Sequence, residues 1–385
     1  SGELEDKRMR ILVINWQDIK NPLGGGAEVH LFEIFSRISK WGHDITLLCS
    51  RFSGAKREEI VQGIRVIRCG TRGTFNFFVP FVYYALGKNL EFDVVVEDIN
   101  KIPFYSPLFV KKPLLGIIHH LFGKTIYKET TFPAATYVYL SERLIPFFYK
   151  NVPFSVVSQS SKQELSHMGM REKNLTVIYN CVDHQLYRPS GLAKFDIPTV
   201  AFIGRLKKYK SVDTLIKAMR IVADKIDRVK LLIIGEGSDK NQLQRLTVKL
   251  GLNSTVEFTG YIGERRKVEL LERSHVVVNS SPKEGWGLTN IEANACGTPV
   301  IASDAPGLKD SVIDGQTGLL FEYGNIRDLA EKIILILGDR KLREKLSTGA
   351  LNWASGFDWD VSAAQMLNLL SQAINKNRPL SIIQN

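Results

Sequence analysis

Two acidic residues, Glu284 and Glu292, stand eight positions apart in this 385-residue sequence and are its strongest candidates for chemistry. They could form an acid/base pair, a metal site, or two contacts to one elongated substrate. On a single helix they would lie about 12 Å apart along the axis, whereas the paired carboxylates of glycosidases lie about 5 to 9.5 Å apart. The spacing therefore disfavours a hydrolytic carboxylate pair.

The residues around Glu284 indicate a loop followed by a helix. Three of them oppose a regular helix: Pro282, Gly285 and Gly287. We therefore expect Glu284 on a loop and a helix that begins near Leu288 or Thr289, with Glu292 on that helix. The N–H groups at the helix start, at Gly287 and Leu288, would face an anion. In a nucleotide sugar, the hydroxyl groups of the sugar and of the ribose lie on either side of an anionic diphosphate. Two carboxylates with an anion site between them therefore fit a nucleotide sugar. The alternative is a loop charge and a surface helix residue.

A second candidate group follows the apolar run TVAFIG, residues 199–204. Arg205 and Lys210 stand five positions apart, with Lys207 and Lys208 between them. Basic side chains at the end of a strand and beside a helix start form phosphate sites. The alternative is a solvated basic loop. We favour the phosphate site because ligands of doubly wound sheets bind at the carboxyl ends of the strands.

Two further strand ends carry candidates. One is the loop Gly24-Gly25-Gly26, which lets the backbone approach a ligand but is neither a dinucleotide fingerprint nor a P-loop. The alternative for this loop is a tight turn that needs positive φ. The other is His119, which follows the run LLGII and precedes His120. His119 either faces a ligand or is structural. A metal site needs more than two ligands, and two adjacent strand residues such as His119 and His120 point to opposite faces of the strand.

Strands and helices that alternate along the chain must position these candidates. Apolar runs of β-forming residues, beginning with RILVIN at 10–15, are followed by turns and by stretches with helical spacing. Because the strands are almost wholly apolar, helices should cover both faces of each sheet. The pattern breaks at 182–198, which we interpret as a linker. We predict Rossmann-like domains at 9–181 and 199–358, and a last helix at 359–376 that crosses back to the first domain.

Composition and charge limit the class of protein. The chain is 44% apolar and 24% charged, and no apolar run reaches the ~18 residues that cross a bilayer. The net charge of +11 is spread over both halves, which suits an anionic ligand or surface and does not indicate nucleic-acid binding. The four cysteines form no CxxC pair and no zinc-ligand spacing, which fits a reducing cytoplasm. We expect a cytoplasmic protein.

Residues 99–150 combine basic and aromatic side chains. They contain seven Lys or Arg, eleven aromatic residues and only two acids, Glu129 and Glu142. One interpretation is a helix-rich core with lysine caps. The other is a surface that rests on the anionic inner face of a membrane. The aromatic residues considered for that surface include Phe104, Tyr105, Phe109, Phe122, Phe147, Phe148 and Tyr149.

Together these motifs resemble those of the family 4 retaining glycosyltransferases of the GT-B fold. The segment EGWGLTNIEANACGTPVIAS, which starts at Glu284, is similar to the E-x7-E signature of that family. The resemblance covers nearly the whole chain. It implies an α/β architecture of two Rossmann-like, doubly wound domains that face a central cleft. Four further segments occur in the family's order and spacing: GGAE at 25–28, VIYNCVD at 177–183, GRLKKYK at 204–210 and DGQTGLLF at 314–321.

The resemblance assigns roles to the charged candidates. Arg205 and Lys210 match the basic pair that holds the diphosphate and stabilises the leaving group. Glu284 matches the carboxylate that binds hydroxyls of the donor sugar, and Glu292 matches the one that binds the ribose. His119 matches a strand-end histidine near the transferred sugar.

Further residues complete the donor site that the resemblance implies. Gly287 and Leu288 match backbone donors to sugar and phosphate, and Gly25 and Gly26 match a loop that approaches the diphosphate. Trp286 is a departure, because phenylalanine is more usual there. The remaining predicted contacts are Gly285, Trp286 and Thr289 to the donor, and Gly260 and Tyr261 to the nucleotide base.

The resemblance implies a retaining hexosyltransferase that needs no metal or other cofactor. The expected donor is UDP-glucose or a similar UDP-hexose, with GDP-mannose as the alternative. The expected acceptor is a saccharide or a lipid-linked acceptor in cell-envelope or exopolysaccharide synthesis. Two other functions fit the same fold: a sugar-nucleotide epimerase and a non-catalytic subunit that binds nucleotide sugars. The presence of both glutamates and both cations weakens the second.

Overall fold

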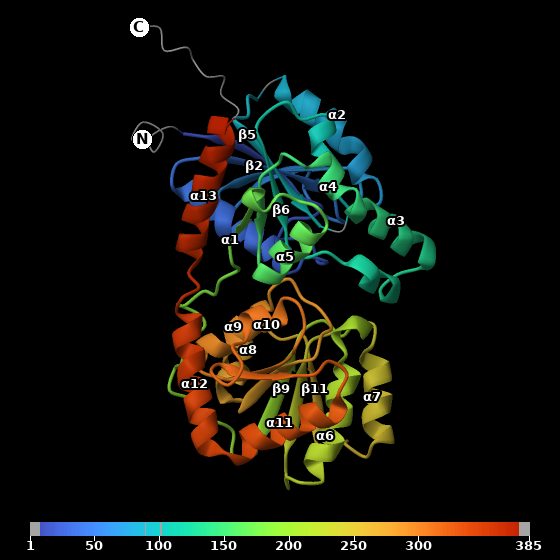
Figure 1. The fold of residues 1–385 in the computed structure, drawn as a ribbon, viewed down its shortest axis with the longest axis vertical. Coiled ribbons are helices and arrows are strands. Elements are labelled where there is room, and N and C mark those ends of the chain that lie inside the picture. Colours follow the sequence, from blue (N-terminus) through green and yellow to red (C-terminus); the bar gives the residue numbers. More distant parts are fainter. Residues whose placement is uncertain (1–7, 89, 101, 377–385) are drawn as a thin grey trace. The chain divides into compact units, whose positions relative to one another are not determined.

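The chain divides into two compact units (Figure 1). The computed structural model describes residues 8–88, 90–100 and 102–376. Unit 1 ends at Asn180 and resumes at Trp359, and unit 2 runs from Cys181 to Asp358. Residues 182–198, predicted as a linker, belong to unit 2 and contain no helix or strand.

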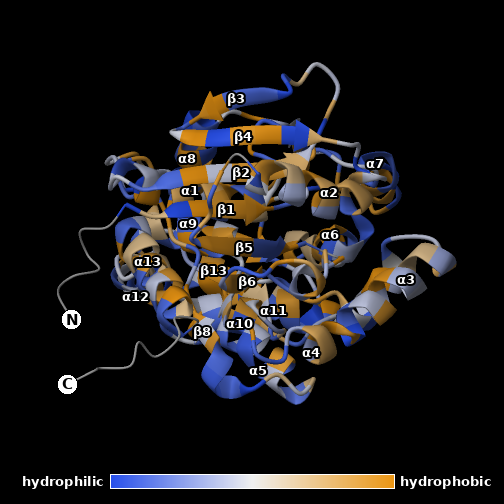
Figure 2. Ribbon diagram, turned by 90° about the horizontal axis from the view of Figure 1, so that it is seen from above, coloured by the Kyte–Doolittle hydropathy of each residue, from blue (hydrophilic) through white to orange (hydrophobic). Residues whose placement is uncertain are grey.

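Unit 1 contains an eight-stranded sheet. In chain order its strands are β1 (Arg10–Ile14), β2 (Asp44–Ser50), β3 (Glu58–Val61), β4 (Ile64–Cys69), β5 (Val94–Ile99), β6 (Leu114–Ile118), β7 (Phe154–Val156) and β8 (Leu175–Val177). Across the sheet the order is β3-β4-β2-β1-β5-β6-β7-β8, which Figure 2 shows from β3 to β6. All neighbours are parallel except β3, which pairs antiparallel with β4. The sequence pattern did not predict β3, because only one of its four residues is buried.

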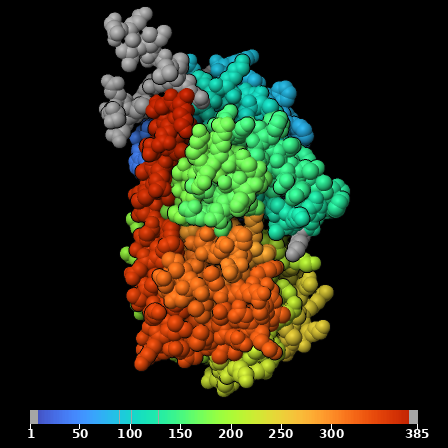
Figure 3. Space-filling model, in the orientation of Figure 1, coloured from blue at the N-terminus to red at the C-terminus, as the bar shows by residue number. Residues whose placement is uncertain are grey.

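The helices of unit 1 come from two distant parts of the chain. The last helix, α13 (Trp359–Lys376), packs on α1 (Gly26–Lys40), and Arg37 Nε donates to Asp360 Oδ1 at 2.6 Å. Figure 3 shows the outer side of α13, in red, at the surface of unit 1. The other α-helices described in this unit are α2 (Phe75–Gly87), α3 (Phe132–Arg143), α4 (Ile145–Phe148) and α5 (Gln159–His167).

Burial on both faces explains the apolar strands of unit 1. The last four residues of β1 are all buried. Leu12 and Ile14 share a core with Phe75 and Val79 of α2. The side chains between them point to the opposite face of the sheet. Each buried aliphatic side chain contributes about 1.5–3 kcal/mol to stability, so a strand of this kind requires cover on both sides.

Unit 2 contains a six-stranded sheet in which all neighbours are parallel. Its strands are β9 (Thr199–Ile203), β10 (Lys230–Ile234), β11 (Val256–Gly260), β12 (Val276–Asn279), β13 (Val300–Ser303) and β14 (Gly318–Phe321), in the spatial order β11-β10-β9-β12-β13-β14. Its α-helices are α6 (Val212–Ala223), α7 (Lys240–Lys249), α8 (Glu264–Arg273), α9 (Leu288–Ala295), α10 (Leu308–Ser311), α11 (Ile326–Gly338) and α12 (Arg340–Ala354).

The strand order of unit 2 determines where a ligand can bind. The chain runs outward from β9 to β11 and then returns to the other side of β9 with β12. The order therefore reverses between β9 and β12, and ligands of doubly wound sheets bind outside the carboxyl ends of the strands at such a point. The loops that follow β9 and β12 carry Lys210 and Glu284.

The prediction of two doubly wound α/β domains is confirmed by these two sheets. Among the residues that the structure describes, no helix combines the length and the apolar character needed to cross a membrane.

Candidate active site

The end of the sheet in unit 2 brings two of the predicted charged residues together. Lys210 ends the short 3₁₀ helix Lys208–Lys210 after β9, and Glu284 lies on the loop after β12. Because β9 and β12 are neighbours, the two loops meet, and Lys210 Nζ forms an ion pair with Glu284 Oε1. A cation suited to phosphate and a carboxylate suited to hydroxyl groups are therefore in direct contact.

Serine hydroxyls hold both partners of this ion pair. Ser281 Oγ donates to Glu284 Oε1 at 2.7 Å. Ser280 Oγ lies 3.0 Å from the carbonyl oxygens of Lys210 and Ser211, to which it donates. Both serines are fully buried. The bond from Ser281 goes to a charged group and contributes about 1.5–3 kcal/mol, whereas each bond from Ser280 to a neutral carbonyl contributes about 0.5–1.5 kcal/mol, so Ser281 orients the carboxylate and Ser280 holds the backbone of the Lys210 loop.

The charge of Lys210 suits anion binding. Burial acts to lower its pKa, but the adjacent carboxylate of Glu284 together with the neighbouring Tyr209 outweighs burial, and the pKa is raised. The Lys210 and Glu284 side chains are 17% and 19% exposed, so a ligand can reach both. Arg205 is exposed on the same loop, and its charge acts on Lys210 in the opposite sense to Glu284. The loop after β9 thus presents two neighbouring cations.

Two glycines allow the loop that carries Glu284 to take its shape. Gly307 has a φ of +81°, and a Cβ at this position would lie 2.0 Å from the carbonyl oxygen of Glu284. Gly287 also has a φ of +81° and directly precedes α9, which begins at Leu288 as predicted. The first N–H groups of a helix have no partner within it. Leu288 and Thr289 therefore offer donors to an anion next to Glu284.

Trp286 lies in the interior of unit 2. Its side chain is 2% exposed, and its ring meets that of Phe357 edge-on, with the ring centroids 5.2 Å apart. The indole thus packs behind the loop and does not present a face to a ligand. A contact between Trp286 and a donor would come from its backbone, which lies between Gly285 and Gly287.

The second carboxylate, Glu292, has a lysine of its own. It lies on α9, and its Oε2 is 2.9 Å from Nζ of Lys267 on α8. The two side chains are 9% and 15% exposed. Glu284 and Glu292 therefore lie on a loop and a helix, as predicted, and each is paired with a different lysine. No sequence signal distinguished Lys267 from the other charges of the segment ERRKVELLER.

The predicted base-binding residues lie at the end of the edge strand β11, where Gly260 is the last residue of the strand and Tyr261 follows it. Gly260 has a φ of +73°, and the side chain of Tyr261 is 84% exposed, so its ring can stack on a planar base. The loops that follow the neighbouring strands β9 and β10 pack closely against each other, because a Cβ at Gly237 would lie 2.1 Å from the carbonyl oxygen of Leu206. The backbone at these strand ends is therefore closely fixed.

A buried amide network that the sequence analysis missed supports the start of α9. Asn279 Nδ2 lies 3.3 Å from Asn290 Oδ1, and Asn290 Nδ2 lies 3.0 Å from Ser311 Oγ. Asn290 is fully buried. The one available signal was the polar residue Asn279 at the end of the apolar run VVVN.

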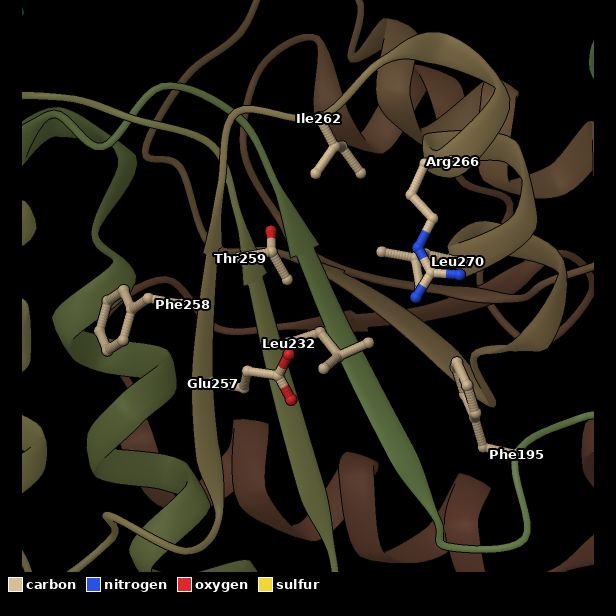
Figure 4. A pocket seen from close by; sticks show the side chains of 8 residues that line it. All are labelled: Phe195, Leu232, Glu257, Phe258, Thr259, Ile262, Arg266 and Leu270. Atoms are coloured by element: carbon tan, nitrogen blue, oxygen red, sulfur yellow. The ribbon is translucent and has the colours of Figure 1, made fainter.

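A separate pocket of about 410 Å³ lies between β11 and α8 (Figure 4). None of the residues lining it is a predicted site residue, and its charged groups come from Glu257 on β11 and Arg266 on α8. It therefore does not correspond to the predicted donor site. The lining residues are Phe195, Leu232, Glu257, Phe258, Thr259, Ile262, Arg266 and Leu270.

In unit 1 the glycine loop is held by an acid that follows it. Gly25 is the N-cap of α1, and its N–H donates to Glu28 Oε2 at 2.7 Å. None of Gly24, Gly25 and Gly26 has a positive φ, so a tight turn of that kind does not explain them. No atom lies within 4 Å of the position that a Cβ on Gly26 would take. A ligand can therefore approach the backbone at Gly26.

His119 follows β6 and is paired with a buried acid. Its Nε2 lies 3.1 Å from Oδ1 of Asp98, the last residue but one of the wholly buried strand β5. His119 is 6% exposed, and its ring meets that of His30 edge-on at 4.9 Å between centroids. Burial acts to lower the pKa of His119, but Asp98 and then Glu28 outweigh it, and the pKa is raised. The sequence analysis did not identify Asp98, although an acid near the end of an apolar strand was a usable signal.

The predicted site residues are divided between the units. Gly25, Gly26 and His119 belong to unit 1, and all the others belong to unit 2. Within the described parts of the chain, no three or more His, Cys, Asp or Glu residues are grouped so that they could hold a metal ion.

Two family models match adjacent parts of the chain. The one described as Glycosyltransferase Family 4 matches residues 24–186, and the one described as Glycosyl transferases group 1 matches residues 184–353. Among curated proteins, the D-inositol 3-phosphate glycosyltransferase of Corynebacterium aurimucosum is 29% identical over 58% of this chain and 57% of its own length. The chain spans about half the length of this relative and of two others with the same name.

Two solved structures share the fold. Sucrose-phosphate synthase from Thermosynechococcus elongatus gives a TM-score of 0.81 at 21% identity and covers 96% of this chain and 100% of that chain. HepE from Anabaena, solved in complex with UDP and glucose, gives a TM-score of 0.76 at 20% identity and covers 95% and 100% of the two chains. At these identities the likeness shows the fold alone.

Replacing Gly307 by alanine tests the packing of the Glu284 loop. The left-handed backbone alone should cost about 1–2 kcal/mol, and the clash with the Glu284 carbonyl a further ~1–3 kcal/mol. Gly315→Ala is the matched control, because Gly315 has a φ of +71° with nothing within 4 Å of an added Cβ. Urea unfolding measures both free energies. Equal losses in the two variants would show that Gly307 does not support the loop.

Proposed function

Because the chain belongs to the family 4 glycosyltransferases of the GT-B fold, we propose that it moves a hexose from a nucleotide diphosphate sugar to an acceptor hydroxyl. The observation that supports this best is the Lys210–Glu284 ion pair beside the exposed Arg205. It places cations for a diphosphate next to a carboxylate for sugar hydroxyls. The carboxylate of Glu292 would hold the ribose.

The proposed chemistry depends on charge that develops on the leaving group. When the bond between the sugar and the phosphate breaks, its electron pair stays on the diphosphate oxygen. Lys210 and Arg205, with the N–H groups of Gly287 and Leu288, would meet that charge as it forms. Glu284 would orient the sugar by accepting hydrogen bonds from its hydroxyls. These groups are preorganised by the serine and glycine contacts described above.

We further propose that the reaction retains the configuration of the anomeric carbon and uses no metal ion. The acceptor hydroxyl would attack from the face that the leaving diphosphate departs from, and its proton would pass to the departing phosphate oxygen. The two cations would supply the charge stabilisation that a metal provides in other phosphate-transfer sites. His119 would lie near the transferred sugar, with Asp98 orienting its ring.

The proposed donor is a UDP-hexose, with UDP-glucose as the first choice and GDP-mannose as the alternative. The support is that HepE, which shares the fold, was solved in complexes with UDP and glucose and with UDP-glucose. The proposed acceptor is a saccharide or a lipid-linked acceptor of the cell envelope or an exopolysaccharide. A thermal-shift screen of nucleotide sugars tests the donor, because a ligand at 100 times its Kd adds ~2.7 kcal/mol of stability.

Lys210→Ala and Glu284→Ala should each abolish sugar transfer while the protein remains folded. Lys210→Ala removes a cation from the leaving group, and Glu284→Ala removes a sugar contact, each worth about 100-fold or more in rate. Lys207→Ala is the control, because Lys207 is exposed on the same loop and is not assigned a contact. Transfer is measured with radiolabelled donor, and folding by thermal melting. Turnover near the wild-type rate in either variant would contradict the site assignment.

The proposed contact with an anionic membrane has two candidate surfaces. In the segment 99–150, six of the seven aromatic residues named above are buried or half-buried, so these six do not form such a surface. The same segment exposes Phe147 and three other aromatic residues, Tyr127, Phe132 and Tyr137, so membrane contact through it stays a prediction. Helix α2, outside that segment, also exposes Phe77, Phe78, Phe81 and Tyr84, which we call the α2 face.

The α2 face is apolar and has basic neighbours. Phe77 and Phe81 are 67% and 75% exposed, and Figure 2 shows the helix in hydrophobic colours. Residues 70–88 contain Arg72 and Lys88 and no acid. The Tyr84 hydroxyl donates to the carbonyl oxygen of Phe109 at 3.1 Å, which brings the exposed pair 111–112, both lysines, close to the helix. Aromatic rings beside lysines suit the headgroup region of an anionic bilayer.

Vesicle flotation tests the α2 face. Wild-type protein should float with vesicles that contain anionic lipid and should stay in solution with neutral vesicles. Each buried phenylalanine ring contributes about 1.5–3 kcal/mol, so Phe77→Ser with Phe81→Ser should lower the partition more than about 10-fold. Phe132→Ser is the control, because Phe132 is 74% exposed on α3. Binding that does not depend on anionic lipid, or an equal loss in both variants, would contradict the assignment.

A further inference from the structure

Glu292 lies in a compact cluster of polar side chains. Lys267 Nζ is 2.9 Å from Glu292 Oε2 and 3.6 Å from Glu264 Oε2. The Tyr187 hydroxyl donates to the carboxylate of Glu264, and the Tyr187 ring centroid is 5.2 Å from Lys267 Nζ. We call these four residues the Glu292 cluster. It joins α8, α9 and the irregular segment 182–198.

Lys267 and Glu292 have little access to water, whereas the second carboxylate, that of Glu264, is 60% exposed. Tyr187 is 5% exposed, and the Lys267 and Glu292 side chains are 15% and 9% exposed. Burial acts to lower the pKa of Lys267, but Glu292 and Glu264 outweigh it, and the pKa is raised. Burial and the same carboxylates raise the pKa of Tyr187. Lys267 therefore stays charged and Tyr187 keeps its proton as a donor.

These contacts limit the orientations of the Glu292 carboxylate. A glutamate side chain has three torsions, and a ribose presents adjacent hydroxyls that need acceptor oxygens in a fixed direction. Lys267 holds one oxygen of Glu292. Tyr187, through Glu264, limits where Lys267 can lie. Without Lys267 the carboxylate of Glu292, which is 9% exposed, would lose its cation, and an unpaired charge is unfavourable in a buried place.

We infer that Lys267 and Tyr187 are positioning residues that orient the Glu292 carboxylate toward the hydroxyls of a nucleotide ribose. This inference rests on the proposed function, in which Glu292 binds the ribose. Lys267 acts directly through its ion pair, and Tyr187 acts through Glu264 and through its own interaction with Glu292. A purely structural role, in which the cluster only ties α8 to α9, would not depend on the ribose hydroxyls.

A binding cycle distinguishes these two roles. Calorimetry gives the Kd of UDP and of 2′-deoxy-UDP for wild-type protein, Glu292→Gln, Lys267→Met and Lys267→Arg, with GDP and 2′-deoxy-GDP as a parallel pair. The wild-type protein should bind the ribose form about 10- to 100-fold more tightly, as expected for a hydrogen bond to a charged group. That ratio should fall about 10-fold in Glu292→Gln and Lys267→Met and should be retained in Lys267→Arg.

Two further variants keep the test decisive. Lys267→Met together with Glu264→Gln removes the repulsion between carboxylates and serves if the single variant does not fold. Tyr187→Phe removes only the hydroxyl, and we expect it to lower the ratio about threefold, less than the loss of a direct charged contact. Arg266→Met is the matched control, because Arg266 lies on the same helix with 55% of its side chain exposed and pairs with Glu269. The control should keep the wild-type ratio.

The outcomes separate this inference from the proposed function. If wild-type protein binds neither ribose nucleotide, or if Glu292→Gln keeps the wild-type ratio, the proposed ribose contact itself fails. If Glu292→Gln lowers the ratio but Lys267→Met and Tyr187→Phe do not, Glu292 binds the ribose and the positioning role is overturned. Equal weakening of ribose and deoxyribose nucleotides in the Lys267 and Tyr187 variants would show a structural role and would also overturn it.

Discussion

The ion pair between Lys210 and Glu284 is the interaction on which the rest of the candidate site depends. It joins the loops that follow β9 and β12. These two strands are neighbours in the sheet, although 72 residues separate the end of β9 at Ile203 from the start of β12 at Val276. Without a ligand, each partner satisfies the charge of the other in a partly buried place, where an unpaired charge is costly. A donor with both a diphosphate and hydroxyl groups could replace these contacts on both sides, which a simple anion or a neutral sugar could not.

The surrounding structure fixes the two loops at the distance that this pair needs. Gly307 lets the backbone pass against the Glu284 carbonyl, and Ser280 ties the Lys210 loop to the end of β12. The second carboxylate repeats the arrangement, because Glu292 is paired with Lys267 across α8 and α9. Glu284 and Glu292, which stand on either side of Trp286 in the sequence, are thus not partners of each other. Each is oriented by a lysine from a different element.

Local signals explain what could be predicted from the sequence. The apolar runs predicted most of the strands, though not β3, and the glycines before Leu288 predicted the start of α9, because both depend on neighbouring residues. The choice of ion-pair partner depends on strand order and helix register, so Lys267 and Asp98 were not identified. Side-chain direction also depends on packing, so the pattern could not show that Trp286 is buried or that α2 exposes four aromatic side chains. Those features required the packing of segments far apart in the chain.

The most direct test of this account is a crystal structure of the protein with the nucleotide sugar that it binds most tightly. The account predicts a diphosphate oxygen about 2.7–2.9 Å from Lys210 Nζ, and a hydroxyl group of the sugar within hydrogen-bond distance of the Glu284 carboxylate. A structure in which the Lys210–Glu284 pair is intact and the diphosphate is bound elsewhere would contradict it.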